Sequence, residues 1–326
     1  MTDRPVAAWP GPDGEAPPVS VGTITDKTSG LSILMIVGAV GLFALADVFA
    51  KLLTADVRAP QIVWVRYASM LALGLVLVLD RGGRGWRVRR PMLQGLRGGA
   101  VLMSGGLFIL GLGRLPLPET TAVSFVTPTF ATVMAILFLK EKVARRRWTA
   151  LIVGLAGILI LLRPGGALFS ASALYPLGSA FFGAAAIVLT RRIGSEDAPA
   201  TTLLWSALTG FGLLSLSAPL WFTLMDGLAL AAAAIMGASY AAGQFLLIVA
   251  YGRGEASLLA PFSYVQVVFA ALLGASVFGW APDAAGGLGM GVVVFSGVYI
   301  LYREGVLARL RFKGMSMRRA RRRAAS

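Results

Sequence analysis

Long apolar runs separated by short polar connections make up most of this chain. A helix crosses a bilayer with roughly 20 apolar residues, because each residue advances it by about 1.5 Å. The apolar runs reach that length, and the connections between them are too short to hold a soluble domain. The pattern therefore predicts an all-α integral membrane protein with ten transmembrane helices, at 31–53, 60–80, 92–113, 117–139, 146–163, 172–192, 200–221, 226–250, 256–279 and 283–302.

Composition agrees with a membrane protein and removes several kinds of chemistry. Of the 326 residues, 57% are hydrophobic and 14% are charged, whereas a soluble domain has about 25% charged residues. The chain has no Cys and no His, which excludes disulfides, Cys/His metal sites, Cys nucleophiles and His general bases. We expect no cofactor and no metal, and any proton coupling has to use carboxylates such as Asp47 or Glu119.

The basic residues are distributed unevenly between the two sides of the predicted bundle. Thirty Lys and Arg stand against fifteen Asp and Glu, which gives a net charge of +15. Ten spans place alternate connections on opposite sides of the membrane and both termini on the same side. Twenty-four of the thirty basic residues then lie on the side of the termini, and three lie within spans. The opposite side has only Arg58, Arg114 and Arg163. The positive-inside rule then predicts a multi-pass protein of the bacterial inner membrane with both termini in the cytoplasm.

The two tails differ in composition. Residues 1–30 hold five Pro and four Gly and no apolar run, which is typical of a disordered segment. Residues 303–326 form a basic cytoplasmic tail. Beside a membrane, the expected partner of such a tail is anionic lipid, at about 1 kcal/mol per basic residue near the surface. We expect no nucleic-acid partner.

An internal repeat relates the two halves of the chain. A shift of 139 residues aligns Gly113-Arg114 with Gly252-Arg253, and SFVTPTFA (124–131) with SYVQVVFA (263–270), in which four of eight positions are identical. Chance and shared apolar composition are the alternative explanation. The shift corresponds to five spans, so the second copy enters the membrane from the opposite side. The sequence therefore predicts two inverted five-helix repeats, 31–163 and 172–302, an arrangement typical of alternating-access carriers.

Several stretches carry a family resemblance. They include FALADVFAKLL and PQIVWVRY in the first two spans, TAVSFVTPTFATVMAILFLKEK around the fourth, and YAAGQFLLIVAYGRGEASLLAPFSYVQVVFAALLG in the second half. The chain resembles the EamA-type ten-helix carriers of the drug/metabolite transporter superfamily, in particular the branch that includes riboflavin and S-adenosylmethionine carriers.

The resemblance implies a secondary active transporter of a small organic metabolite, with a central cavity that opens alternately to each side. A flippase of a lipid-linked small molecule and a membrane-embedded enzyme are the alternatives. An enzyme needs a clustered catalytic set, and the internal loops are short and basic, so we expect no catalytic residues.

Ionisable residues inside a span cost roughly 2.5–3.5 kcal/mol at its centre, so each one needs a reason. Asp47 and Lys51 are four residues apart on one helical face and are expected to form an ion pair; the alternative is that Asp47 contacts a cationic substrate or takes a proton. Arg66, flanked by Trp64 and Tyr67, is expected either to pair with Asp47 or a carbonyl, or to bind an anionic group at the cavity mouth. Arg97, near the start of its span, is interpreted as an interfacial anchor.

Polar side chains in the fourth, eighth and ninth spans complete the candidate site. Phenol and amide groups suit neutral or zwitterionic substrates with aromatic surface, although buried Tyr and Gln also serve as interhelical hydrogen-bond partners. The candidate cavity residues are Asp47, Arg66, Trp64, Thr127, Tyr240, Gln244, Tyr264 and Gln266.

Proline and glycine mark two further features. Pro128 removes a backbone donor in the middle of the fourth span, which is tolerated where the freed carbonyl faces a cavity or a polar partner, or in a simple packing kink. Gly95 and Gly99 form a GxxxG pair, for which helix packing is the expected role and a homodimer is the lesser possibility.

Overall fold

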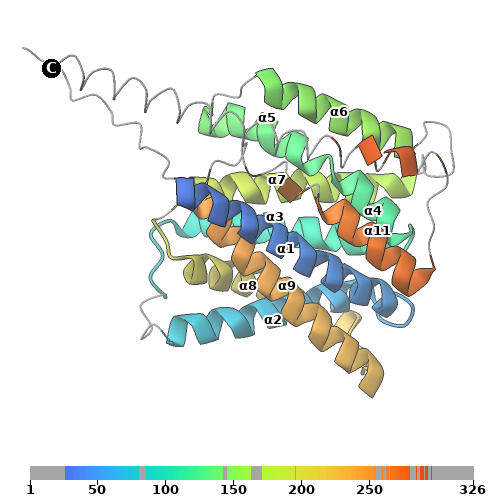
Figure 1. The fold of residues 1–326 in the computed structure, drawn as a ribbon. Helices are drawn as coiled ribbons and strands as arrows, with labels where there is room; N and C mark the ends of the chain where they lie inside the picture. The colour runs from blue at the N-terminus through green and yellow to red at the C-terminus, as the bar shows by residue number, and fades with distance from the viewer. Residues whose placement is uncertain are drawn as a thin grey trace, which may run out of the picture.

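The described part of the chain is a bundle of apolar helices (Figure 1). The computed structural model describes residues 26–80, 86–141, 145–162, 171–194, 196–254, 259, 262–263, 265–279, 284, 287–289, 291–292 and 295. None of these residues lies in a β-strand. Residues 1–25, the whole 303–326 tail and most of the tenth expected span lie outside the described residues.

Ten α-helices have described bounds, and they follow the apolar runs closely. Among the described residues, seven helical segments are long and apolar enough to cross a membrane, with α4 and α5 counted together, and α11 is a shorter apolar helix. The protein is therefore a multi-pass membrane protein. The helices are α1 Asp26–Leu53, α2 Ala59–Leu79, α3 Pro91–Leu112, α4 Leu117–Ser124, α5 Thr127–Leu139, α6 Arg145–Leu162, α7 Leu174–Ile193, α8 Pro199–Leu216, α9 Gly227–Arg253 and α11 Val265–Phe278.

Local sequence signals explain where several helices begin. Proline occupies the first turn of α2, α3, α4, α5 and α8, a position where its missing N–H has no helical partner to lose. Asp226 caps α9 by accepting a hydrogen bond from the Ala229 N–H at 2.7 Å, as acidic N-cap residues commonly do.

The fourth span is interrupted, whereas the sequence predicted one helix over 117–139. α4 ends at Ser124 and α5 begins at Thr127. The cause is Pro128, which has no N–H to donate to the Ser124 carbonyl one turn earlier. The Thr127 hydroxyl donates to that carbonyl instead, at 2.6 Å. The freed acceptor therefore has a side-chain partner, although the continuous helix is lost.

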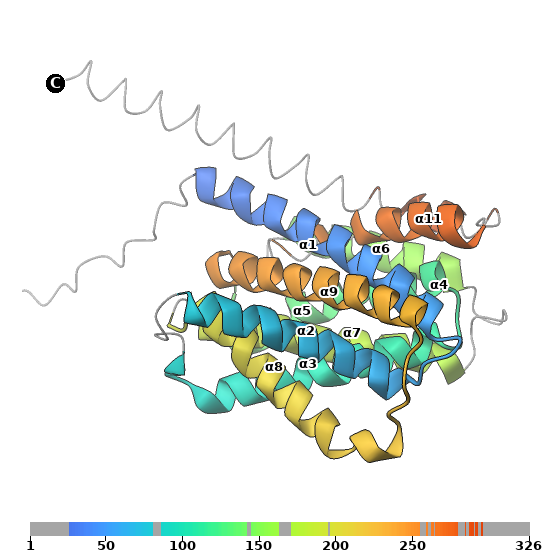
Figure 2. The ribbon, with the colours of Figure 1, turned by 90° about the horizontal axis from the view of Figure 1, so that it is seen from below.

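Helices from the two halves of the chain pack side by side. α1 packs along α9, α3 along α7, and α2 along α8. In Figure 1, α2 and α8 lie at the bottom of the bundle and α6 at the top, and Figure 2 shows α1 beside α9 from below. Gly243 permits the close α1–α9 approach, because a Cβ there would lie 2.8 Å from the Phe43 ring. The predicted packing role does not hold for Gly95 and Gly99, whose Cβ positions meet no described atom within 4 Å.

Polar contacts tie the helices at both ends of the bundle. At one end, the Arg90 guanidinium makes two 2.7 Å hydrogen bonds to the Glu196 carboxylate. The neighbouring Asp197 accepts from the Arg89 N–H at 2.9 Å and from Gln94 Nε2 at 3.0 Å. At the opposite end, Gln61 Nε2 donates to the Thr223 carbonyl at 2.6 Å. These contacts fix how α2, α3 and α8 stand around the centre.

Candidate functional site

A cavity of about 190 Å³ lies at the centre of the bundle. Its wall is formed by α1, α2, α3, α4, α5, α7, α9 and α11, so both halves of the chain contribute to it. Apolar atoms provide most of the surface, and about half of the lining residues carry a polar group; a mostly apolar surface with polar groups that orient the ligand is usual for small-molecule sites. The predicted candidates Asp47, Arg66, Thr127, Tyr240, Gln244 and Gln266 all line this cavity.

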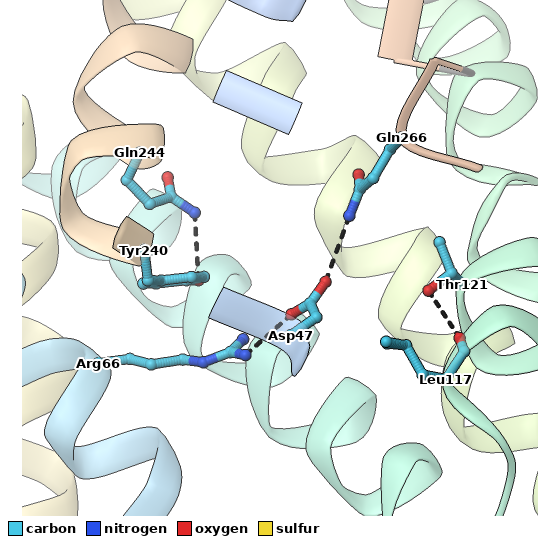
Figure 3. Close-up of polar contacts among 7 residues, drawn as sticks. All are labelled: Asp47, Arg66, Leu117, Thr121, Tyr240, Gln244 and Gln266. Carbon is cyan, nitrogen blue, oxygen red and sulfur yellow. Dashed lines mark hydrogen bonds and ion pairs between the residues drawn. The ribbon is translucent and has the colours of Figure 1, made fainter. Parts of the chain in front are cut away.

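Asp47 is the centre of the polar network (Figure 3). Its Oδ1 accepts a hydrogen bond from Arg66 Nη2 at 2.9 Å, and both side chains are almost fully buried. Its Oδ2 accepts from Gln266 Nε2 at 3.3 Å. Asp47 therefore connects α1 to α2 and α11, and its charge is balanced by Arg66. Burial of both charges requires this kind of paired and hydrogen-bonded arrangement.

Tyr240 and Gln244 extend this network along α9. The Arg66 guanidinium lies over the Tyr240 ring, 4.6 Å from its centroid, a distance typical of a cation–π contact. Gln244 Nε2 donates to the Tyr240 hydroxyl at 3.1 Å. The Phe43 ring lies 5.5 Å from the Tyr240 ring, centroid to centroid. The arrangement places a flat aromatic surface beside a buried charge pair.

The interruption between α4 and α5 forms another part of the wall. Ser124, Thr127 and Pro128 all line the cavity. A backbone break at membrane depth is tolerated where it faces a cavity or protein rather than lipid. The sequence left open whether Pro128 serves a cavity or a packing kink, and its position on the wall agrees with the first interpretation.

Arg97 is not at the interface, and its interpretation as an anchor is wrong. Its side chain is completely buried and lines the same cavity. Arg97 Nε donates to Thr190 Oγ1 at 2.7 Å and Nη1 donates to Ser206 Oγ at 2.5 Å. A helical-face signal was present in the sequence, because Gln94, Arg97 and Ser104 fall on one face of an otherwise apolar helix.

The predicted pair between Asp47 and Lys51 is also wrong. Lys51 Nζ donates to the Leu112 carbonyl at 2.5 Å and to the Leu115 carbonyl at 3.1 Å. It thus satisfies carbonyls at the C-terminal end of α3, where a positive charge is favourable. The alternative for Arg66, a pair with Asp47, is confirmed.

Trp64 and Glu119 are not on the described cavity wall. Trp64 packs away from it, with its ring 5.2 Å from that of Phe211 and its Nε1 donating to Ser215 Oγ at 2.9 Å. Glu119 is half-buried in the first turn of α4. Tyr264 lies outside the described residues. Sequence reasoning missed several other wall residues, namely Phe43, Arg97, Ser104, Phe108, Thr121, Ser179 and Tyr251.

The fold and the cavity together define a class: a multi-pass helical membrane protein with a partly charged central cavity. Residues 30–163 match the EamA-like transporter family. The chain is 33% identical over 196 residues to a riboflavin transporter of Vibrio cholerae, a match that covers 58% of this chain and 64% of that protein. It is 26% identical over 259 residues to an S-adenosylmethionine uptake transporter of Rickettsia felis, covering 79% and 88%.

Two further comparisons agree with this class. A pseudopaline exporter of Pseudomonas aeruginosa is 27% identical over 267 residues, covering 78% of this chain and 92% of that protein. A protein of known crystal structure, 20% identical, superposes with a TM-score of 0.68 over 82% of this chain and 94% of its own, which shows the shared fold. Residues 30–163 therefore carry an EamA-like transporter domain, and the chain is similar to curated small-metabolite transporters over most of its length. The matched part spans a little under two thirds of the Vibrio cholerae relative.

Proposed function

We propose that this protein is a secondary active transporter of a small organic metabolite and works by alternating access. The observation that carries the proposal is the buried Asp47–Arg66 pair in a central cavity whose wall comes from both halves of the chain. Ionisable groups at membrane depth mark substrate or ion pathways by default, because they are costly to bury. The curated relatives named above are transporters or exporters of small molecules.

Helix order supports the proposed inverted repeat, 31–163 and 172–302. Adding 139 to the bounds of α2, α3 and α5 gives 198–218, 230–251 and 266–278, each within three residues of α8, α9 and α11. The packing follows the same relation: if α1 corresponds to α7 and α3 to α9, the α1–α9 contact maps onto the α3–α7 contact. On this scheme the tenth helix, 283–302, is the counterpart of α6. Two such halves can exchange conformations and so open the cavity to either side.

The charge at the two ends of the bundle supports the proposed orientation. One end of the bundle contains the start of α3 and the end of α7. There Arg90 pairs with Glu196, and the Arg191 side chain approaches Glu141. Most of the basic connections of the chain are expected to join helices at this same end. The proposal places this end, and both termini, in the cytoplasm, where anionic lipid would contact the 303–326 tail.

The cavity surface favours substrates with an aromatic or heteroaromatic ring. Phe43, Phe108, Phe125 and Tyr240 contribute aromatic faces to it, and such faces stack on flat rings. Riboflavin and S-adenosylmethionine, the compounds named for two relatives, are therefore the first candidates.

Uptake into proteoliposomes tests the proposal. Purified protein is reconstituted, and entry of radiolabelled riboflavin and S-adenosylmethionine is compared with protein-free vesicles and with vesicles that contain the Asp47→Asn variant. Saturable uptake by the wild type that the variant lacks would support transport through this cavity. If no water-soluble metabolite moved while a lipid-linked one crossed between leaflets, the carrier proposal would be abandoned in favour of a flippase.

A further inference from the structure

Arg97 is a buried cation that no described carboxylate neutralises. It lies in the second turn of α3, with no exposed surface. Its described partners are two hydroxyl groups, Thr190 Oγ1 on α7 and Ser206 Oγ on α8. No carboxylate of the described residues lies within ion-pair distance of it. A hydroxyl accepts a hydrogen bond but carries no charge, so the guanidinium has no counter-ion among the residues that the structure describes.

The charge balance of the cavity is therefore positive. Three of its described wall residues are formally charged, namely Asp47, Arg66 and Arg97. Asp47 and Arg66 neutralise each other at 2.9 Å. One positive charge remains on a mostly apolar surface. Removing a charge from water is expensive unless a partner or ligand compensates it, so the uncompensated charge among the described wall residues suits an anionic ligand.

The hydrogen bonds of Arg97 leave part of its guanidinium group available for such an anion. Thr190 Oγ1 donates to the Ala186 carbonyl at 2.7 Å, so the lone pairs of this hydroxyl remain for Arg97. The two hydroxyls use one N–H on Nε and one on Nη1 of the five that a guanidinium carries. The remaining donors suit a carboxylate or phosphate, which arginine binds in a planar, two-point fashion.

Gln244 adds a second point of recognition in the same cavity. Its Nε2 is engaged by the Tyr240 hydroxyl, and its Oε1 is buried without a hydrogen-bond partner among the described residues. A buried acceptor that lacks a partner is destabilising, because it has lost its hydrogen bonds to water. A ligand that supplies an N–H or O–H group there would recover this cost.

We propose that Arg97 binds the carboxylate or phosphate group of the transported metabolite, while Gln244 accepts a hydrogen bond from a donor group of the same molecule. This inference rests on the proposed transport function and narrows its substrate to a class, an anion-bearing compound with an aromatic ring and a hydrogen-bond donor. A lipid headgroup also carries a phosphate that Arg97 could bind. The experiment therefore has to distinguish a soluble metabolite from a lipid.

Two pairs of soluble compounds test the proposal on purified protein in detergent. S-adenosylmethionine is compared with its decarboxylated form, and riboflavin 5′-phosphate with riboflavin, so that each pair differs in one anionic group. The wild type should bind the anionic member of at least one pair about tenfold or more tightly, which corresponds to about 1.4 kcal/mol. Arg97→Gln should remove this preference, and Arg97→Lys should retain part of it because the charge remains.

Inorganic phosphate gives a readout that does not depend on the candidate substrates. Phosphate should raise the unfolding temperature of the wild type by at least about 2 °C over chloride at equal ionic strength. The rise should be absent in Arg97→Gln and present in Arg114→Gln, which removes an exposed arginine outside the cavity. The same unfolding measurement with phosphatidylglycerol added to the micelles tests whether a lipid phosphate occupies the site.

Each outcome decides the question. Equal binding within both pairs together with no phosphate effect in the wild type would overturn the proposal, and these measurements need no variant to fold. A preference that survives in folded Arg97→Gln would overturn it as well, and a response to phosphatidylglycerol alone would assign the site to lipid. If none of the four compounds binds but phosphate stabilises the wild type through Arg97, the anion site stands and the candidate substrates of the proposed function fail.

Discussion

Asp47 on α1 and Arg66 on α2 form an ion pair of 2.9 Å in the wall of the central cavity. The same Arg66 guanidinium lies over the Tyr240 ring of α9, and the same Asp47 carboxylate accepts from Gln266 of α11. One pair of charges thus joins four helices that come from both halves of the chain. A substitution of either Asp47 or Arg66 should therefore disturb contacts on all four of these helices.

Asp47→Asn should impair transport more than membrane insertion. The substitution leaves Arg66 buried without its counter-charge, a loss on the order of 3–5 kcal/mol for buried pairs, and initial uptake rates should fall at least about tenfold. Thermal unfolding in detergent should show a lower midpoint. The double variant Asp47→Asn/Arg66→Gln removes both charges and should regain much of that stability without regaining transport. If the Asp47→Asn variant took up substrate with the kinetics of the wild type, Asp47 would have only a structural role.

Gly210→Ala should destabilise the bundle at the α2–α8 contact. A Cβ at Gly210 would overlap the ring of the fully buried Tyr67, and overpacking of this kind costs about 1–3 kcal/mol. Gly212 on the same helix provides a matched control, because its Cβ would meet no described atom within 4 Å. Gly212→Ala should leave the unfolding midpoint unchanged or raise it, since alanine favours a helix by about 0.5–1 kcal/mol over glycine. Equal effects of the two substitutions would contradict the described packing.

Asp197 and Glu196 should differ sharply although they are neighbours. Asp197 is buried and accepts from the Arg89 N–H and the Gln94 amide. Asp197→Ala should therefore lower stability by about 1–3 kcal/mol, as expected when buried donors lose their acceptor. Glu196 pairs with Arg90 in an exposed position, and Glu196→Ala should cost less than about 1 kcal/mol. Denaturation midpoints of the two variants, measured side by side, check this order, and a reversed order would refute it.

The membrane orientation can be tested with single cysteines, because the chain has none of its own. Arg146→Cys should be protected from membrane-impermeant thiol reagents in intact cells, and Arg114→Cys should react. The reason is that the basic 140–147 connection is expected on the cytoplasmic side and Arg114 on the opposite side. Both should react after the cells are opened. Labelling of Arg146→Cys in intact cells would reverse the orientation.

The sequence predicted the helix positions well because transmembrane helices are defined by continuous apolar runs. The expected span at 31–53 coincides with the apolar part of α1, and that at 92–113 differs from α3 by one residue at each end. Asp47 and Arg66 stood out as candidates for the same reason, since an ionisable residue in such a run needs an explanation. The only sequence signal for the interruption after Ser124 was Pro128. Whether a proline bends or interrupts a helix depends on the groups packed around it, and the sequence does not show these.

Side-chain partners could not be predicted in the same way. Asp47 has Lys51 one turn away on its own helix, but it pairs with Arg66 because the rotation of α2 against α1 brings that guanidinium to it. Arg97 resembled an interfacial residue by its distance from the start of α3. Its burial depends on Thr190 and Ser206, which lie about a hundred residues further along the chain and meet it only through tertiary packing.

The hydrogen bond between the Thr127 hydroxyl and the Ser124 carbonyl has a consequence for the cavity that they both line. In a continuous helix this carbonyl would be committed to a backbone N–H and could be released only by unwinding a turn. Here its partner is a side chain that turns about a single bond, and threonine has more than one accessible rotamer in such positions. Rotation of the Thr127 side chain would therefore expose a main-chain oxygen to the cavity without breaking a backbone hydrogen bond.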